Sequence, residues 1–366
     1  MTRNFALSAS MLALIAASPA MAHHPGGGGA NTGNAGPINT IPATTIEQGH
    51  AAFAVTYEHT RFGGLSDAQL IDAAANHIHA HSIKTIQVPA ISAAYGVTND
   101  FMISARLPFV LRTDIREGHH EHDGTTGAAI NTVDARGDSS GIGDMTFLGQ
   151  YRFPQRPFGA EIAVLFGIQV PTGATNERDN FGRLFEAEFQ PGSGSWDPIF
   201  GAAITRRFGP WSFDANWLYQ VVTTGTQDTD LGDQFRYNFA ASYRVMGYSG
   251  DPLAAFAHDP PGGHRHAHGH THRHVGKAPH VHPPAAPGFG LDLILELNGE
   301  YDQKEKIAGV VNDNSGGHVL YLSPGIRASY DRFSAFASVG IPLIKEMNGL
   351  QSEPEYRVVV GAAASF

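Results

Sequence analysis

The last eleven residues of the chain alternate strictly between two faces. One face carries Tyr356, Val358, Val360, Ala362, Ala364 and Phe366, and the other carries Arg357, Val359, Gly361, Ala363 and Ser365. A β-strand of about this length can cross a membrane when it is tilted. The same pattern also suits a buried strand of a β-sandwich that happens to end the chain. Features elsewhere in the sequence must distinguish these two interpretations.

The amino terminus has the features of an export signal. Arg3 supplies a short positive region, Phe5 to Ala17 is an uncharged apolar run, and Ala20-Met21-Ala22 is a small-x-small cleavage site. We therefore predict a signal peptide over residues 1–22, because the apolar run is too short for a spanning helix. An exported chain that ends on an aromatic strand resembles the bacterial outer-membrane β-barrels, whose assembly machinery reads that end. This resemblance implies a location in the cell outer membrane of a Gram-negative bacterium. It also implies outer-membrane lipid and the barrel assembly machinery as partners.

Composition excludes several other classes of protein. The chain has no cysteine, so it has neither a disulfide framework nor a thiolate metal site. Its net charge of −10 offers no footprint for nucleic acid. The mean hydropathy of −0.18 is that of a soluble protein, but barrel strands alternate and do not run apolar, so they escape a hydropathy scan.

Alternation continues along most of the mature chain. Residues 23–46, rich in Gly, Asn, Thr and Pro, predict a flexible periplasmic leader. Residues 47–366 contain about twelve alternating segments, with an uncertainty of two. The third of them is typical, with Phe101, Ile103, Ala105, Leu107 and Phe109 opposite Met102, Ser104 and Arg106. The predicted fold is all-β, a transmembrane antiparallel up-and-down β-barrel of about twelve strands, and an even count agrees with bacterial barrels.

The connections between these segments alternate in length. Short links include Thr98 to Asp100, Phe208 to Pro210 and Asp331 to Arg332, whereas Arg112 to Ser140 and Thr172 to Ser195 are long. Bacterial barrels have short periplasmic turns and longer extracellular loops. An ordinary all-β protein has no reason to alternate in this way, so the pattern favours the barrel over the sandwich.

Charged residues recur on one face of the predicted strands. On the lipid face each would cost a few kcal/mol at mid-depth, so we expect them to face the lumen. Mixed signs suit either a lined open channel or a barrel closed by salt bridges. The predicted lumen-lining residues are Arg106, Asp144, Arg152, Glu161, Asp214, Arg236, Arg244, Asp292, Glu296, Arg327 and Arg357.

One connection breaks the alternation of loop lengths. Residues 247–287 form a long insertion at a position where a short periplasmic turn is expected, and they are rich in histidine. Neutral imidazole is a common ligand for Zn, Cu and Ni, and a flexible His-x-His tract can wrap around an ion. A Pro- and Gly-rich loop does not supply the fixed partners of a catalytic centre. We predict capture of divalent metal, with an incidental solvated loop as the alternative, and the candidate ligands are His264, His266, His268, His270, His272, His274, His280 and His282.

Two smaller histidine clusters are weaker metal candidates. His77, His79 and His81 are spaced at two, so an extended chain would place them on one face at the outer mouth. The second cluster lies among acidic residues in the second outer loop and comprises His119, His120 and His122. Taken alone, each cluster could be a polar loop with coincidental histidines.

Several short motifs resemble the MetA-pathway phenol degradation family of outer-membrane transporters. They are Gly141-Ile-Gly-Asp144, Gln169-Val-Pro-Thr-Gly173, Gln190-Pro-Gly-Ser-Gly-Ser-Trp-Asp-Pro198 with the hairpin Gly209-Pro-Trp211, and Leu322-Ser-Pro-Gly-Ile-Arg327. The resemblance implies a barrel that passes small, often hydrophobic, compounds and brings no catalytic residues. The histidine insertion departs from the family pattern.

Three classes of function follow from these observations. The first is a transport barrel or channel for small solutes whose histidine-rich loop captures divalent metal. A generic family-type channel for small hydrophobic or aromatic compounds is the alternative within this class. The second class is a non-conducting periplasmic metal buffer or sensor. The third class, a barrel enzyme such as a lipase or protease, needs a nucleophile paired with a base at the rim. The serines and histidines show no such pairing, so we expect no enzyme and no tightly bound cofactor.

Overall fold

Twelve of the fourteen strands in the main sheet form a closed ring, and each is antiparallel to both neighbours. The computed structural model describes residues 35–247 and 288–366. Within those residues no helix is long and apolar enough to cross a membrane. In ring order the strands are β1 (Ala51–Gly63), β3 (Thr85–Thr98), β4 (Phe101–His122), β6 (Met145–Arg152), β7 (Glu161–Val170), β8 (Asp197–Phe208), β9 (Trp211–Gln220), β11 (Gln234–Met246), β12 (Phe289–Asp302), β15 (Gly317–Tyr330), β16 (Phe333–Met347) and β17 (Glu353–Ser365). The prediction of an antiparallel barrel of about twelve strands is confirmed.

The carboxy-terminal strand closes the ring. β17 pairs with β1 from Ala52 opposite Ser365 to Gly63 opposite Glu353. Beyond this ladder, the backbone N–H of Ala51 donates to the Phe366 carbonyl at 3.0 Å, and the Phe366 N–H donates back to Ala51 at 2.8 Å. A closed ladder leaves no unpaired edge, which is the condition for placing a sheet in lipid.

Each barrel strand has one apolar outer face and one polar inner face. In β1 the side chains of Phe53 and Val55 are more than half exposed, whereas Thr56 and Glu58 are buried. The exposed face of the barrel carries the large apolar residues of every ring strand, so it forms a belt that suits lipid. The period of two therefore sorts the sequence into a lipid side and a lumen side.

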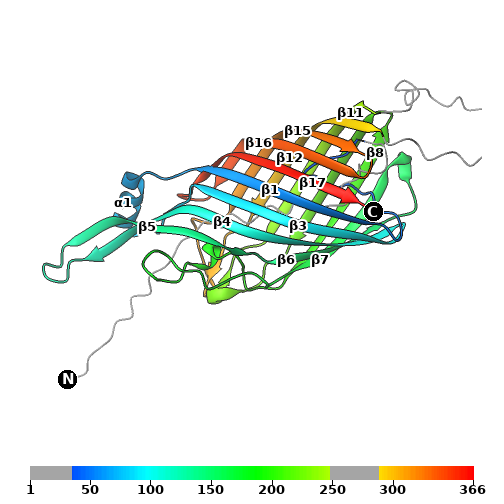
Figure 1. The fold of residues 1–366 in the computed structure, drawn as a ribbon. Coiled ribbons are helices and arrows are strands. Elements are labelled where there is room, and N and C mark those ends of the chain that lie inside the picture. The colour runs from blue at the N-terminus through cyan, green and yellow to red at the C-terminus, as the bar shows by residue number, and fades with distance from the viewer. Residues whose placement is uncertain (1–34, 248–287) are drawn as a thin grey trace, which may run out of the picture.

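The two ends of the barrel differ in their connections. Short turns at Asn99–Asp100, Gly209–Pro210 and Asp331–Arg332 lie at the end that carries the carboxy terminus (Figure 1). All the longer described loops lie at the other end, which we call the outer mouth because bacterial barrels place long loops outside the cell. These connections carry the remaining short elements: α1 (Asp67–Ala75), β2 (His81–Ser82), β5 (Ala129–Ile142), η2 (Ala187–Phe189), η3 (Thr226–Asp228), β10 (Thr229–Asp230), β13 (Lys306–Ile307) and β14 (Val310–Val311) at the mouth, and η1 (Pro157–Gly159) at the opposite end.

A hairpin of β4 and β5 extends beyond the outer mouth, with α1 packed on it (Figure 1). The inner half of β4 pairs with β6 and its outer half with β5. Helix α1 begins at a capping box, in which Ser66 and Gln69 cap each other's backbone N–H groups. Gly118 of β4 allows the helix to dock, because a Cβ there would lie 2.2 Å from the Leu70 carbonyl oxygen.

Three predicted segments lie wholly or partly outside the described residues. The signal peptide (1–22) and the first part of the leader fall in residues 1–34. The histidine-rich insertion, with His264, His266, His268, His270, His272, His274, His280 and His282, falls in residues 248–287.

Candidate functional site

Residues 35–46 lie inside the barrel. The sequence predicts a flexible leader here, but side chains from Ala35 to Thr44 are buried among the lumen-facing residues of the strands. Ile38 packs with Ile294 and Val359, and Ile41 packs with a second apolar group that includes Leu148. Composition suggested flexibility because the segment lacks periodicity. Contacts with the strands of the surrounding barrel wall hold the segment in place.

Glu296 of β12 anchors this segment. Its carboxylate accepts hydrogen bonds from three consecutive backbone N–H groups, those of Ile38 at 3.1 Å, Asn39 at 2.9 Å and Thr40 at 3.0 Å. The Asn39 side-chain amide donates a fourth at 2.6 Å. A buried carboxylate needs such donors, because an unpaired charge away from water is costly. Sequence alternation placed Glu296 in the lumen but gave no sign of its partner.

Further strands hold the rest of the segment. The Ile41 N–H donates to Asn216 Oδ1 of β9 at 2.9 Å, and the Ala43 N–H donates to Thr205 Oγ1 of β8 at 2.8 Å. The Gln150 side-chain amide of β6 donates to two carbonyls of the segment, at 3.0 and 2.9 Å. Arg327 of β15 donates to the Pro37 carbonyl. Residues 37–44 are therefore bonded to opposite walls, so they cross the lumen.

Six of the eleven predicted lumen residues form ion pairs within the barrel wall. Ten of the eleven are buried, and Arg152 is partly exposed. Arg244 pairs with Asp292 across β11 and β12. The other pairs are Arg357 with Glu58 and Glu300 at 3.3 and 2.6 Å, Arg236 with Asp302 at 2.7 Å, and Arg152 with Glu161 at 3.2 Å. Most of these ion pairs join neighbouring strands, so they stabilise the wall of the barrel.

Asp144 ties the family motifs together at the outer end of the lumen. It accepts from the Gly173 N–H at 2.8 Å and from both the N–H and the hydroxyl of Ser193 at 2.7 Å. Glycine is required on both sides of this contact, because a Cβ on Gly173 would lie 2.5 Å from the Cα of Gly192. Three motifs far apart in sequence therefore fix the loop between β7 and β8 over the mouth. Beneath it lies a small cavity of about 50 Å³.

The inner side of the mouth contains buried acids. Burial, together with the nearby Glu305, raises the pKa of Glu188 well above its ordinary value. Burial also raises the pKa of Glu305 to about 7. Phe185 and Phe189 cover this region in an apolar cluster with Ile83 and Ile115. The mouth is thus packed as a small core and is not a water-filled vestibule.

The histidines of both small clusters meet on the β4–β5 hairpin. His77 does not share a strand face with its neighbours, because its backbone is left-handed with φ of 56° and its ring packs 4.6 Å from that of His120. The Nδ1 of His120 lies 2.6 Å from Asn131 Oδ1. His119 lies 3.8 Å from Glu121, and His122 lies 3.3 Å from the Gly127 carbonyl.

His79 and His81 point to a common place beside Glu117. Within the described parts of the chain, these are the residues that bring three ligand atoms within 4.8 Å of one another. Burial, and then the neighbouring His81, lower the pKa of His79, which favours its neutral form. Such an arrangement of two imidazoles and one carboxylate can hold a transition metal ion.

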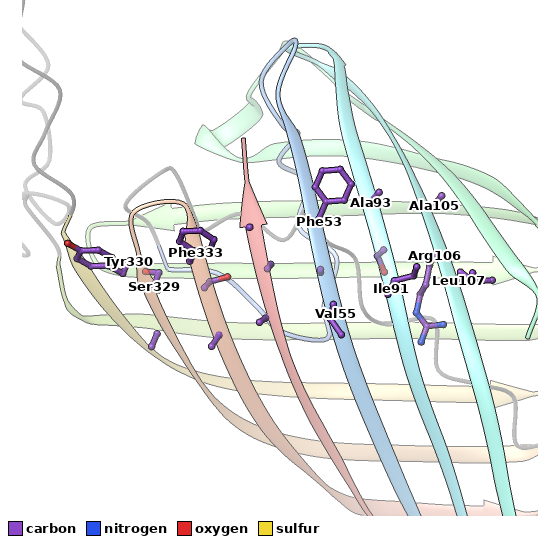
Figure 2. Close-up of a pocket in the computed structure, with 18 of the residues that line it drawn as sticks. Phe53, Val55, Ile91, Ala93, Ala105, Arg106, Leu107, Ser329, Tyr330 and Phe333 are labelled. Carbon is purple, nitrogen blue, oxygen red and sulfur yellow. The ribbon is translucent and has the colours of Figure 1, made fainter. Parts of the chain in front are cut away.

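A hollow of about 910 Å³ lies on the outside of the barrel, not in the lumen. It is lined by the outward-facing Phe53, Ile91, Tyr330 and Phe333, over strands that carry small residues such as Ala93 (Figure 2). These four large side chains are each more than half exposed. The hollow therefore faces lipid.

A closed barrel with an apolar belt and a polar lumen has the architecture of a bacterial outer-membrane β-barrel protein. The family model described as "Putative MetA-pathway of phenol degradation" matches residues 93–275, which is half of the chain. The chain belongs to this family. No curated protein matches the sequence.

Among solved structures, an outer membrane channel from Pseudomonas putida F1 is similar in fold. The two are 12% identical with a TM-score of 0.52, and the match covers 88% of this chain and 98% of that one. The monoaromatic hydrocarbon channel CymD matches less well, with 11% identity, a TM-score of 0.39, and coverage of 88% and 89%. The likeness to the Pseudomonas putida channel extends over most of both chains and agrees with the barrel fold predicted from the sequence.

Several site residues were not selected from the sequence. Glu58 and Glu300 lie on the inner face of their strands, and extending the period of two from Thr56 and Asn298 finds both. Gln150 is fully buried on the same kind of face. No sequence pattern identified Asn39 as a site residue, because nothing in a Pro- and Gly-rich leader marks one residue as buried.

Proposed function

We propose that this outer-membrane protein is a channel for small solutes that conducts when residues 35–46 leave the lumen. The observation that supports this most directly is the bonding of that segment to Glu296. The segment has no strand partner and is held by side chains, so it can leave without breaking the barrel ladder. The polar, charged wall that it covers suits small polar or charged solutes, and the family description points to small aromatic compounds as the alternative cargo.

Conductance in planar bilayers tests the proposal. Glu296→Ala removes the acceptor of four hydrogen bonds, and charge-assisted bonds contribute about 1.5–3 kcal/mol each. We expect wild-type protein to be mostly closed and the variant to be open at least about tenfold more often, since 1.4 kcal/mol already corresponds to tenfold.

Asp313→Ala is the matched control, because it removes one negative charge from an exposed side chain of the outer mouth. Its conductance should equal that of wild type. Equal conductance of wild type and Glu296→Ala would show that residues 35–46 do not close the channel. Swelling of liposomes in a sugar solution and in phenol would distinguish polar from aromatic cargo.

We also propose that the histidine-rich segment captures Zn, Cu or Ni at the periplasmic end. The support is its composition and its place: it joins β11 to β12 at the end with the short turns, where the Arg244 N–H donates to the Pro210 carbonyl. Since imidazole binds metal only when neutral, capture should be strong near pH 7.5 and fade below about pH 6.

Deletion of Gly262 to His282 tests this second proposal. Calorimetry should show that the deletion variant loses most bound metal, with copper bound more tightly than zinc or nickel in the intact protein. Heat-modifiable migration on gels checks that the barrel still folds. If both proteins bind equal amounts of metal, the insertion is a spacer and the family-type channel function stands without it.

A further inference from the structure

The side chains of His79, His81 and Glu117 converge at the β4–β5 hairpin, and their ligand atoms lie within 4.8 Å of one another. His81 in β2 lies directly opposite Glu117 in β4 in the strand register. His79 reaches the same carboxylate from the chain that links α1 to β2. The Nδ1 of His79 is 3.3 Å from Glu117 Oε1, and the Nε2 of His81 is 3.5 Å from the same oxygen.

These separations are long for hydrogen bonds but match ligands of a metal ion. Bonds from ring nitrogen to oxygen are usually about 2.7–3.2 Å. Ligand atoms at about 2.0–2.2 Å around a tetrahedral zinc ion lie roughly 3.3–3.6 Å apart. His81 is 1% exposed, and neither of its ring nitrogens has a hydrogen-bond partner among the described residues. A buried imidazole with no hydrogen bond on either ring nitrogen is costly, so this one points to a ligand.

The Glu117 carboxylate is oriented toward the two histidines by an arginine that binds its other oxygen. Arg136 of β5 pairs with Glu117 Oε2, which leaves Oε1 facing the two histidines. The same guanidinium binds Asp179 at 2.7 Å and Glu186 at 2.9 Å. Arg183 is also bonded to Asp179, at 2.9 Å. The three carboxylates therefore outnumber the two arginines by one, which favours an added cation. Such outer partners orient ligands in metal sites.

We propose that His79, His81 and Glu117 form a binding site for a divalent transition metal ion, with zinc as the best match. Two imidazoles and a carboxylate are a common zinc donor set, and a fourth position remains for water or another ligand. The ion would join the α1–β2 connection to the β4–β5 hairpin at the outer mouth. This site is separate from the histidine-rich insertion and does not depend on it.

The test uses the full-length protein and a local readout, since other histidines also bind metal. Hydrogen–deuterium exchange in detergent is followed with and without added zinc chloride, and EDTA then reverses the effect. We expect zinc to slow exchange of the amides in residues 78–82 and 115–119 by about tenfold or more, as metal ligation suppresses local opening. The variants His81→Gln and His79→Gln should abolish this protection.

His119→Gln is the matched control, because His119 is a partly exposed histidine of the same hairpin. It should keep the zinc-dependent protection. Heat-modifiable migration shows whether each variant has folded, and His79→Gln changes a side chain that is 23% exposed, so it should fold even if His81→Gln does not. Equal protection in wild type and His79→Gln, or none in wild type, would overturn the proposal. Conductance of these proteins is a separate readout, so failure of the metal site leaves the channel function untouched.

Discussion

Two buried carboxylates, those of Glu296 and Glu305, differ in how many hydrogen bonds they accept. Glu296 accepts from three backbone N–H groups and a side-chain amide, so its charged form is well solvated by the protein. Glu305 at the outer mouth accepts from Asn312 Nδ2 at 2.6 Å, but its Oε2 atom has no hydrogen-bond partner among the described residues. Burial raises the pKa of Glu305 to about 7. It therefore titrates near neutrality.

Replacement of Glu305 by Gln should flatten the dependence of stability on pH. With a pKa of about 7 in the folded protein, Glu305 binds more protons there than in the unfolded chain between about pH 4.5 and 7. The contribution of Glu305 to the free energy of unfolding is thus fully present below about pH 4.5. It is lost as pH rises through 7, which lowers that free energy by up to about 3 kcal/mol. Glu305→Gln should be more stable than wild type at pH 8 and similar at pH 4.5, measured from the temperature of heat-modified migration.

Asp313→Asn in the same loop is the control, because Asp313 is exposed and its substitution should leave the pH profile unchanged. Parallel profiles for wild type and Glu305→Gln would show that Glu305 is already ionised at neutral pH in the folded protein.

The barrel strands could be predicted from the sequence because each is long and has water or protein on one side and lipid on the other. All twelve alternating segments appear as ring strands. Helix α1 was missed, although Ser66 and Gln69 form a capping box that sequence inspection can detect. The burial of residues 35–46 could not be predicted, because it depends on Glu296, Asn216 and Thr205 from distant strands. Periodicity reports only the local environment of a segment.

The same limit applies to the histidines. Spacing at two suggested a shared strand face for His77, His79 and His81, but the left-handed backbone at His77 sends it to His120 instead. The register of β2 with β4 places His81 opposite Glu117, and this register is set by the tertiary structure. Sequence identified the residue types of the site, and the fold decided which of them meet.

At the scale of the whole molecule, the barrel has two ends with different chemistry. The outer mouth carries the α1 helix, the β4–β5 hairpin and a packed acidic core. The opposite end carries the short turns and the residues that flank the histidine-rich insertion, Met246 and Phe289. The two metal sites proposed above would thus lie on opposite sides of the membrane, that of His79, His81 and Glu117 outside and the insertion inside.

Protease tags should reveal this orientation in cells. A tag placed at the exposed tip of the β4–β5 hairpin, between His122 and Ala129, should be cut in intact cells because that tip lies beyond the outer mouth. A tag within Gly262 to His282 should be cut only after the outer membrane is breached. Cutting of the second tag in intact cells would place the insertion outside and contradict the assignment of the two ends.

The docking of residues 35–46 also has a consequence for the order of folding. This segment precedes every strand, yet its partner Glu296 follows it by 256 to 258 residues. Contacts of such long range form late, because the intervening chain must first be brought together. The lumen wall that receives Ile38 to Thr40 exists only after β12 has joined the barrel. The first described part of the chain to be synthesised is therefore among the last to reach its final position.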